Sequence, residues 1–188
     1  MKLSDGEKLI LIMLTEIYEK LQIKREVDPK LVQSAITGGN LWGLELAYPG
    51  IFHNTEPTPD VISETVDVLD MWRYIESSYQ QLSPDDQAQV KEEARPFGNA
   101  QFRGFDANDE ATYIGVARFV IDALDRFSGF KGRGLNSHMP SLGAHRRMLG
   151  VFTPLRNSLS GSDLTAAQLV EILKEQIHPE NRTIAARA

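Results

Sequence analysis

The chain has 188 residues, which is enough for one domain with a substantial core. Its 26 acidic and 20 basic residues give a formal charge of -6, and this balance disfavours nonspecific binding to nucleic acid, which needs a positive surface. The absence of cysteine excludes disulfides, zinc–thiolate sites, iron–sulfur clusters and cysteine nucleophiles. It also fits a reducing cytoplasm, where we expect the protein to be found.

The first predicted element is an amphipathic helix that ends near Leu21. Ser4-Asp-Gly-Glu7 has the spacing of a capping box and marks its start. Its broad apolar face consists of Leu9, Ile10, Ile12, Met13, Leu14, Ile17 and Leu21. One neighbouring helix would not cover so wide a face, so we expect contacts on two sides, one of which another subunit could supply. The apolar run is too short to cross a membrane, and we expect no membrane partner.

A helix-turn-helix-like segment is predicted next. Asp28-Pro29 has the pattern of an N-cap followed by the first residue of a helix, and Gly38-Gly39 ends that helix. A short helix within 40–48 then completes the spacing, which leaves a nucleic-acid-associated regulator using residues 29–48 as an alternative function. The second helix offers no arginine or lysine to bases or phosphates, so nucleic acid is disfavoured as a partner.

Helix signals continue through the rest of the chain, and no alternating run of β-branched residues indicates a strand. Further helices are expected at 59–82, from 84 to about 95, at about 109–127, at 140–152 and from 165 to about 178. We therefore predict an all-α fold, a bundle of about seven helices around a central helix at about 109–127. A single domain should cover 1–179, and a flexible C-terminal tail should cover 180–188.

The helix at about 109–127 is expected to form the centre of the bundle. Apolar side chains occupy nearly its whole circumference, as in a helix that is surrounded by neighbours. Gly115 lies in its interior, where glycine costs about 1 kcal/mol relative to alanine, and this suggests the close approach of another backbone. Its polar remainder is a charged stripe in which Arg118–Asp122 and Asp122–Arg126 are both i,i+4 pairs. The stripe is interpreted either as a solvent-facing ladder of ion pairs or as a site for a carboxylate of a ligand or another chain.

Several segments resemble one known family. They are Gly104-Phe-Asp-Ala, Glu110-Ala-x-Tyr-Ile-Gly, Val116-Ala-Arg-Phe-Val, Leu135-Asn-Ser-His-Met-Pro140 and His145-Arg-Arg-Met-Leu149. Together they resemble the YfbU family of small bacterial proteins, most strongly over 102–152. The resemblance implies a helical fold without an assigned biochemical activity, and so it implies no catalytic residues.

Metal and nucleophile motifs are incomplete. A di-iron bundle needs two Glu-x-x-His motifs, and Glu175-Gln-Ile-His178 is the one that we find. His138 and His145 are two helical turns apart in sequence, but His138 is expected to precede the helix that contains His145. Neither a nucleophile elbow nor a phosphate-binding loop is present. We therefore predict no metal, no cofactor and no catalytic residue.

The segment Gly129-Phe-Lys-Gly-Arg-Gly134 is glycine-rich and basic, and it could wrap an anion. It follows a helix and does not lead from a strand into a helix N-terminus, so the usual geometry for binding an anion is missing. A flexible connection is the simpler interpretation.

The sequence favours a non-enzymatic helical protein that acts through protein contacts, most simply as a homodimer with a regulatory or stress-linked role. A ligand binder or enzyme that uses the Arg118/Asp122 stripe is the further alternative. The residues predicted to contact a ligand or a partner are Arg118, Asp122, Arg126, Asn136, His138, His145 and Arg146.

Overall fold

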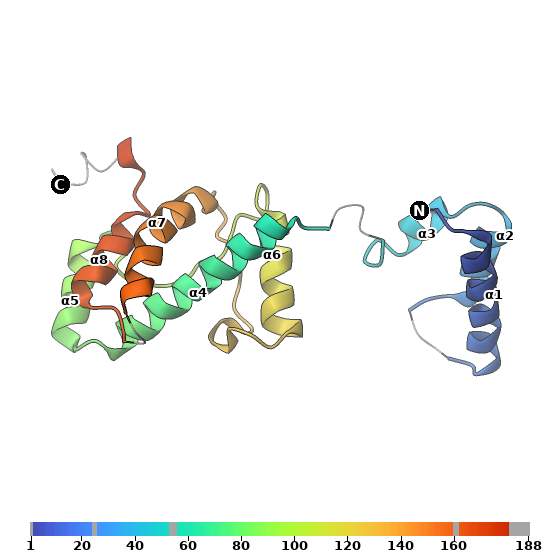
Figure 1. The fold of residues 1–188 in the computed structure, drawn as a ribbon, viewed down its shortest axis with the longest axis horizontal. Coiled ribbons are helices and arrows are strands. Elements are labelled where there is room, and N and C mark those ends of the chain that lie inside the picture. Colours follow the sequence, from blue (N-terminus) through green and yellow to red (C-terminus); the bar gives the residue numbers. More distant parts are fainter. Residues whose placement is uncertain (1, 24–25, 53–55, 160–161, 181–188) are drawn as a thin grey trace. The chain divides into compact units, whose positions relative to one another are not determined.

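The computed structural model describes residues 2–23, 26–52, 56–159 and 162–180. Over these ranges the protein has eight α-helices and no strand, which confirms the all-α fold (Figure 1). Its contacts divide the chain into two compact units, Met1–Glu56 and Pro57–Ala188, and each is described by itself. The single domain over 1–179 stays a prediction. The predicted tail lies, apart from Glu180, outside the described residues.

The N-terminal unit contains three helices. They are α1 (Asp5–Lys20), α2 (Pro29–Thr37) and α3 (Trp42–Ala47), and α2 packs against both of the others. The predicted caps are confirmed. Ser4 and Glu7 form the capping box, and the Lys30 backbone N–H donates to Asp28 Oδ1 over 2.9 Å. Gly39 follows α2 with a φ of +69°, a left-handed conformation that glycine adopts without a steric penalty.

The C-terminal unit contains five α-helices and two short helical turns. They are α4 (Pro59–Gln81), α5 (Pro84–Glu93), α6 (Ala111–Arg118), the π-helical turn η1 (Phe119–Ala123), the 3-10 turn η2 (Ser128–Phe130), α7 (Leu142–Ser158) and α8 (Ala166–Lys174). Figure 1 shows α4 running the length of this unit. Helices α6, α7 and α8 all contact α4, and α5 packs on α8.

The core of this unit is built on α4, and not on the helix at about 109–127 that the sequence analysis placed at the centre. Val68, Leu69, Met71, Trp72 and Ile75 of α4 are each at most 1% exposed. Full burial of each such side chain contributes about 1.5–3 kcal/mol, so α4 supplies a large share of the core's stabilisation. The spacing of these residues predicts an amphipathic helix, but the pattern does not say which helix is surrounded by the others.

The predicted helix at about 109–127 is shorter and less buried than expected. Its α-helical part ends at Arg118, and η1 continues it to Ala123. Beyond it the chain leaves helical geometry, because Asp125 has a φ of +51°. Phe119 and Leu124 are 61% and 52% exposed, so the prediction of burial around the whole circumference was wrong. Helix α6 packs against α4 on one side and is not surrounded.

Gly115 also differs from the sequence prediction. A Cβ added at this position would meet no atom within 4 Å, so no backbone approaches it closely. A glycine that does permit a close approach is Gly104, which has a φ of +91°. A Cβ added there would lie 2.1 Å from the Leu135 carbonyl oxygen. This contact joins two loops, since the Phe105 N–H donates to that same carbonyl over 3.0 Å and Phe105 forms a parallel bridge with Asn136.

Candidate functional site

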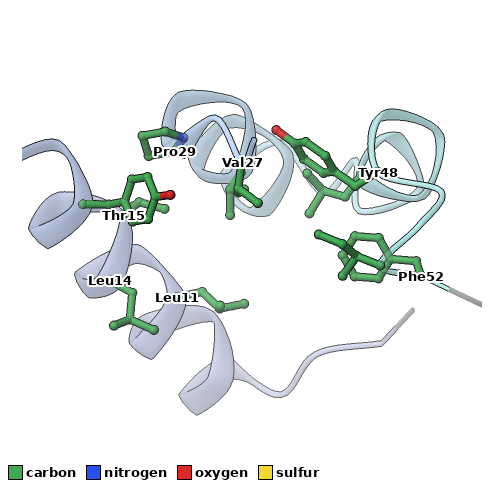
Figure 2. A pocket seen from close by; sticks show the side chains of 11 residues that line it. Leu11, Leu14, Thr15, Val27, Pro29, Tyr48 and Phe52 are labelled. Carbon is green, nitrogen blue, oxygen red and sulfur yellow. The ribbon is translucent and has the colours of Figure 1, made fainter. Parts of the chain in front are cut away.

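The N-terminal unit contains an apolar cleft of about 300 Å³. Its lining residues are Leu11, Leu14, Thr15, Tyr18, Val27, Pro29, Val32, Leu44, Tyr48, Ile51 and Phe52. Figure 2 shows Leu11 and Leu14 on the α1 side of the cleft, and Tyr48 and Phe52 on the opposite side. The cleft forms because α1 packs on α2 while the segment after α3 brings two aromatic rings back toward α1.

Two of the polar side chains that line this cleft are already hydrogen-bonded within the unit. Tyr48 Oη accepts the Asp28 N–H over 2.8 Å, and Thr15 Oγ1 donates to the Ile12 carbonyl over 2.7 Å. The lining contains no acidic or basic residue. The cleft therefore suits an apolar group, because a charged group would lose its hydration there without gaining a partner.

The helix α1 presents a second apolar surface, which we call the α1 face. It consists of Leu9, Ile10, Met13, Leu14, Ile17 and Leu21, which are between 52% and 65% exposed. Exposed apolar residues scattered singly are ordinary, but a contiguous row on one helix indicates a surface that binds something. Leu14 belongs to both the α1 face and the cleft, so the two surfaces are continuous.

The segment proposed as helix-turn-helix-like has the predicted helices but an apolar exposed surface. Helix α3 has only six residues, and it exposes Trp42 and Leu46. It carries no lysine or arginine that could reach a phosphate. The alternative of a nucleic-acid-associated role for residues 29–48 stays a prediction.

The three residues of the predicted charged stripe lie exposed on the C-terminal unit. Among the described residues, Arg118, Asp122 and Arg126 form no ion pair with one another. The reason is the backbone, which changes to π geometry at Phe119 and leaves the helix before Arg126, so the i,i+4 relation is lost. The Arg126 guanidinium instead lies 5.5 Å from the Phe127 ring centroid. The role of these residues in binding stays a prediction.

Two other predicted residues, Asn136 and His138, lie together. Asn136 Oδ1 accepts the N–H groups of Ala107, over 3.2 Å, and of His138, over 2.9 Å. Asn136 Nδ2 lies 3.2 Å from His138 Nδ1. His138 has a φ of +56°, a left-handed conformation in which the Asn136 carboxamide stabilises the turn.

Arg146 is held by Glu64, a residue that the sequence analysis did not single out. The Arg146 Nε and Nη2 groups donate to the two Glu64 carboxylate oxygens over 2.6 and 2.9 Å. Tyr113 Oη donates to the same carboxylate over 2.6 Å. The hydrogen bond from Arg146 lowers the pKa of Glu64, and the Glu64 carboxylate raises the pKa of Arg146. This bidentate pair joins α4 to α7.

His145 is buried in the core and lies among aromatic rings. Its ring centroid is 5.3 Å from that of Phe105, 5.8 Å from Phe102 and 6.1 Å from Trp72. Its Nδ1 has no hydrogen-bond partner among the described residues. Burial lowers the pKa of His145 to about 4, despite the opposing attraction of Glu110 and Glu64. The neutral imidazole therefore packs as part of the core, and its predicted contact with a ligand or a partner stays a prediction.

We expect His145 to make folding stability fall in mild acid. Its pKa in the folded protein is about 4 and its ordinary value is 6.5, so the unfolded chain binds the proton more readily. The contribution of neutral His145 to the free energy of unfolding is fully present above pH 6.5 and is lost as the pH falls toward 4. The total loss is on the order of 3 kcal/mol. Urea unfolding at a series of pH values measures it. A His145→Phe variant should lack this part of the pH dependence, and an unchanged pH dependence would contradict the assignment.

Glu110 is the strongest polar anchor of the C-terminal unit, and the sequence analysis noted it only as part of a motif. Its Oε1 accepts the N–H groups of Ser141 and Leu142, over 2.9 and 2.7 Å. Its Oε2 accepts the Asp106 N–H over 2.8 Å and the Ser141 hydroxyl over 2.7 Å. Burial alone would raise the pKa of Glu110, but these hydrogen bonds hold it below its usual value. The carboxylate caps α7 from a distant loop, a contact with no local signal in the sequence.

The fold and these sites define a small all-α protein with an apolar cleft and a carboxylate-capped helix. None of the helices described above is long and apolar enough to cross a membrane. Residues 1–174 match the family model described as YfbU domain, and the chain therefore belongs to the YfbU family. A UPF0304 protein of Methanocaldococcus jannaschii is 28% identical over 180 residues, covering 91% of this chain and 98% of that protein. Neither description states a biochemical activity.

Proposed function

We propose that the protein acts through protein–protein contacts and that its first partner is a second copy of itself, bound through the α1 face. The observation that carries this proposal is the continuity of a row of exposed apolar side chains with an apolar cleft. Burying such a row removes apolar surface from water at about 25 cal/mol per Å², which is the main driving force of association.

A two-fold symmetric dimer places the same surface of each subunit in contact with its counterpart. Two α1 helices that pair in antiparallel orientation, with the centre between Met13 and Leu14, would bring Ile10 of one copy to Ile17 of the other. The same arrangement would bring the acidic first turn, with Glu7, near Lys20 at the end of the partner helix. This complementarity of charge along one helix supports a second copy as the occupant.

The cleft extends this contact. Leu14 belongs to both surfaces, so a copy bound on the α1 face can insert an apolar side chain between α1 and the rings of Tyr48 and Phe52. Anchors of this kind, buried near the centre of an interface, carry most of the binding energy.

The test is the mass of the full chain in solution and its response to a charge on the α1 face. The wild-type protein should have the mass of a dimer in size-exclusion chromatography with light scattering at micromolar concentration. Ile17→Glu should give a monomer, because the carboxylate would be buried without a partner. Leu124→Glu is the matched control, since Leu124 and Ile17 are both 52% exposed and Leu124 lies on the other unit. It should remain a dimer.

Circular dichroism of both variants separates loss of association from loss of folding. A wild-type monomer at micromolar concentration would overturn the proposal. The α1 face would then be covered by another part of the same chain or by a different protein. Equal dissociation by Ile17→Glu and Leu124→Glu would also contradict it, because the effect would not be specific to the α1 face.

We infer a cytoplasmic location for this dimer, and the absence of cysteine from the sequence supports it. The predicted regulatory or stress-linked role and the predicted lack of catalysis both stay predictions.

A further inference from the structure

The C-terminal unit has an open concavity that two arginines and a histidine help to line. It has a volume of about 420 Å³ and lies where the loop before α6 meets the loop before α7. Its lining residues are Gln101, Phe102, Arg103, Arg133, Gly134, Asn136, Ser137 and His138. The lining contains no acidic residue, although the chain as a whole carries a net charge of -6.

Arg103 carries the uncompensated charge of this concavity. Within the described ranges its guanidinium takes part in no ion pair or hydrogen bond. Arg133 is held differently, because its two terminal nitrogens donate to the Glu76 carboxylate over 2.8 and 2.9 Å. Glu76 therefore fixes Arg133 as part of the wall and neutralises it. Arg103 is left with its full set of donors and no acceptor.

His138 adds a donor whose identity follows from its neighbours. Asn136 Oδ1 already accepts two backbone N–H groups, so its other carboxamide atom is the Nδ2 donor. That donor lies 3.2 Å from His138 Nδ1, which must act as the acceptor. A neutral imidazole that accepts at Nδ1 carries its proton on Nε2. The ring therefore carries an N–H donor at Nε2, and His138 is one of the residues that line the concavity.

We propose that this concavity binds an oxyanion, the phosphate or carboxylate group of a small molecule, with Arg103 and His138 as its principal ligands. Charge-assisted hydrogen bonds from a guanidinium to such groups are about twice as strong as those between neutral groups. The basic segment 129–134 contributes through Arg133 and Gly134, which form one wall. The left-handed backbone of His138, held by Asn136, keeps the imidazole in place before the ligand arrives.

The test follows the imidazole signals of the full chain by nuclear magnetic resonance while inorganic phosphate is added at constant ionic strength, with chloride as the reference salt. A parallel titration uses acetate. The His138 Nε2 resonance, assigned by its loss in a His138→Gln variant, should shift and saturate. The His145 resonance should not shift, because that ring is buried in the core.

Arg103→Ala should weaken the binding about tenfold or more, since a charge-assisted hydrogen bond contributes about 1.5 kcal/mol or more. Arg156→Ala is the matched control, because Arg156 is also an exposed arginine but lies near the C-terminal end of α7 and does not line the concavity. It should leave the dissociation constant within about twofold.

Saturation with phosphate alone would assign a phosphate group, saturation with acetate alone a carboxylate, and saturation with both a general oxyanion site. The absence of any saturable shift at His138 would overturn the proposal. An equal loss of binding in the Arg103 and Arg156 variants would overturn it too, because the response would then reflect overall charge. The result does not depend on whether the protein is a dimer.

Discussion

Replacing Gly104 by alanine should destabilise the protein by more than about 4 kcal/mol or prevent it from folding, a loss that matches the largest single-residue effects. The new Cβ would lie 2.1 Å from the Leu135 carbonyl oxygen and 2.7 Å from the Leu135 Cα, and both belong to backbone. The φ of +91° adds a penalty for any residue with a side chain. The free energy of unfolding in urea, or the yield of soluble protein, measures the effect.

Gly115→Ala is the matched control for this experiment. The position is helical, and a Cβ there meets no atom within 4 Å, so alanine should stabilise the protein by about 0.5–1 kcal/mol through helix propensity alone. The two substitutions are chemically identical and should have opposite signs. An unfolding free energy of the Gly104 variant within about 1 kcal/mol of wild type would show that the two loops do not approach as closely as the structure has them.

Replacing Glu110 by alanine should cost about 3–5 kcal/mol, because it leaves three backbone N–H groups without their acceptor and removes one of the two acceptors of the Ser141 hydroxyl. Part of the loss is the cap of α7, whose N-cap residue Ser141 forms no side-chain cap of its own. The pKa of Glu110 is lowered in the folded state, so its contribution should be present above the ordinary carboxyl pKa. It should be lost as the pH falls through the folded value.

Glu110→Gln separates hydrogen bonding from shape. With the amide nitrogen in place of Oε2, the Ser141 hydroxyl can accept from it and donate to the Gly104 carbonyl, 3.1 Å away. Only the Asp106 N–H then loses its partner, so the loss should be at least about 1 kcal/mol smaller than for alanine. Glu171→Ala, at an exposed position on α8, should change the unfolding free energy by no more than about 0.5 kcal/mol. Equal losses for the alanine and glutamine variants at Glu110 would contradict the network.

Local signals in the sequence predicted the helices well, because a cap acts within one helical turn. Ser4, Asp28, Thr58, Ser83 and Thr165 each cap the helix that follows. The period of the apolar residues likewise predicted the buried faces of α4, α7 and α8. These features need only neighbouring residues, and the sequence supplies them directly.

Predictions that depended on a distant part of the chain were less secure. The central position belongs to α4 because three other helices lie against it, and no pattern within residues 109–127 could reveal that. The stripe through Arg118 and Asp122 was predicted from α-helical spacing, which the π turn at Phe119–Ala123 removes. The central position was predicted wrongly because apolar composition was used to infer how many neighbours a helix has.

The features of the candidate sites likewise divide into those that the sequence predicted and those that only the structure revealed. The sequence by itself determined the all-α class, the capped helices, the broad apolar face of α1 and the lack of a known catalytic motif, because each is written in residues close together in the chain. Only the tertiary structure decided that the loops at Gly104 and Leu135 meet, that Glu110 caps α7 and that Arg103 and His138 line one concavity. The physical reason is that these contacts join residues about thirty positions apart, and their energy depends on the packing of helices that only the whole fold brings together.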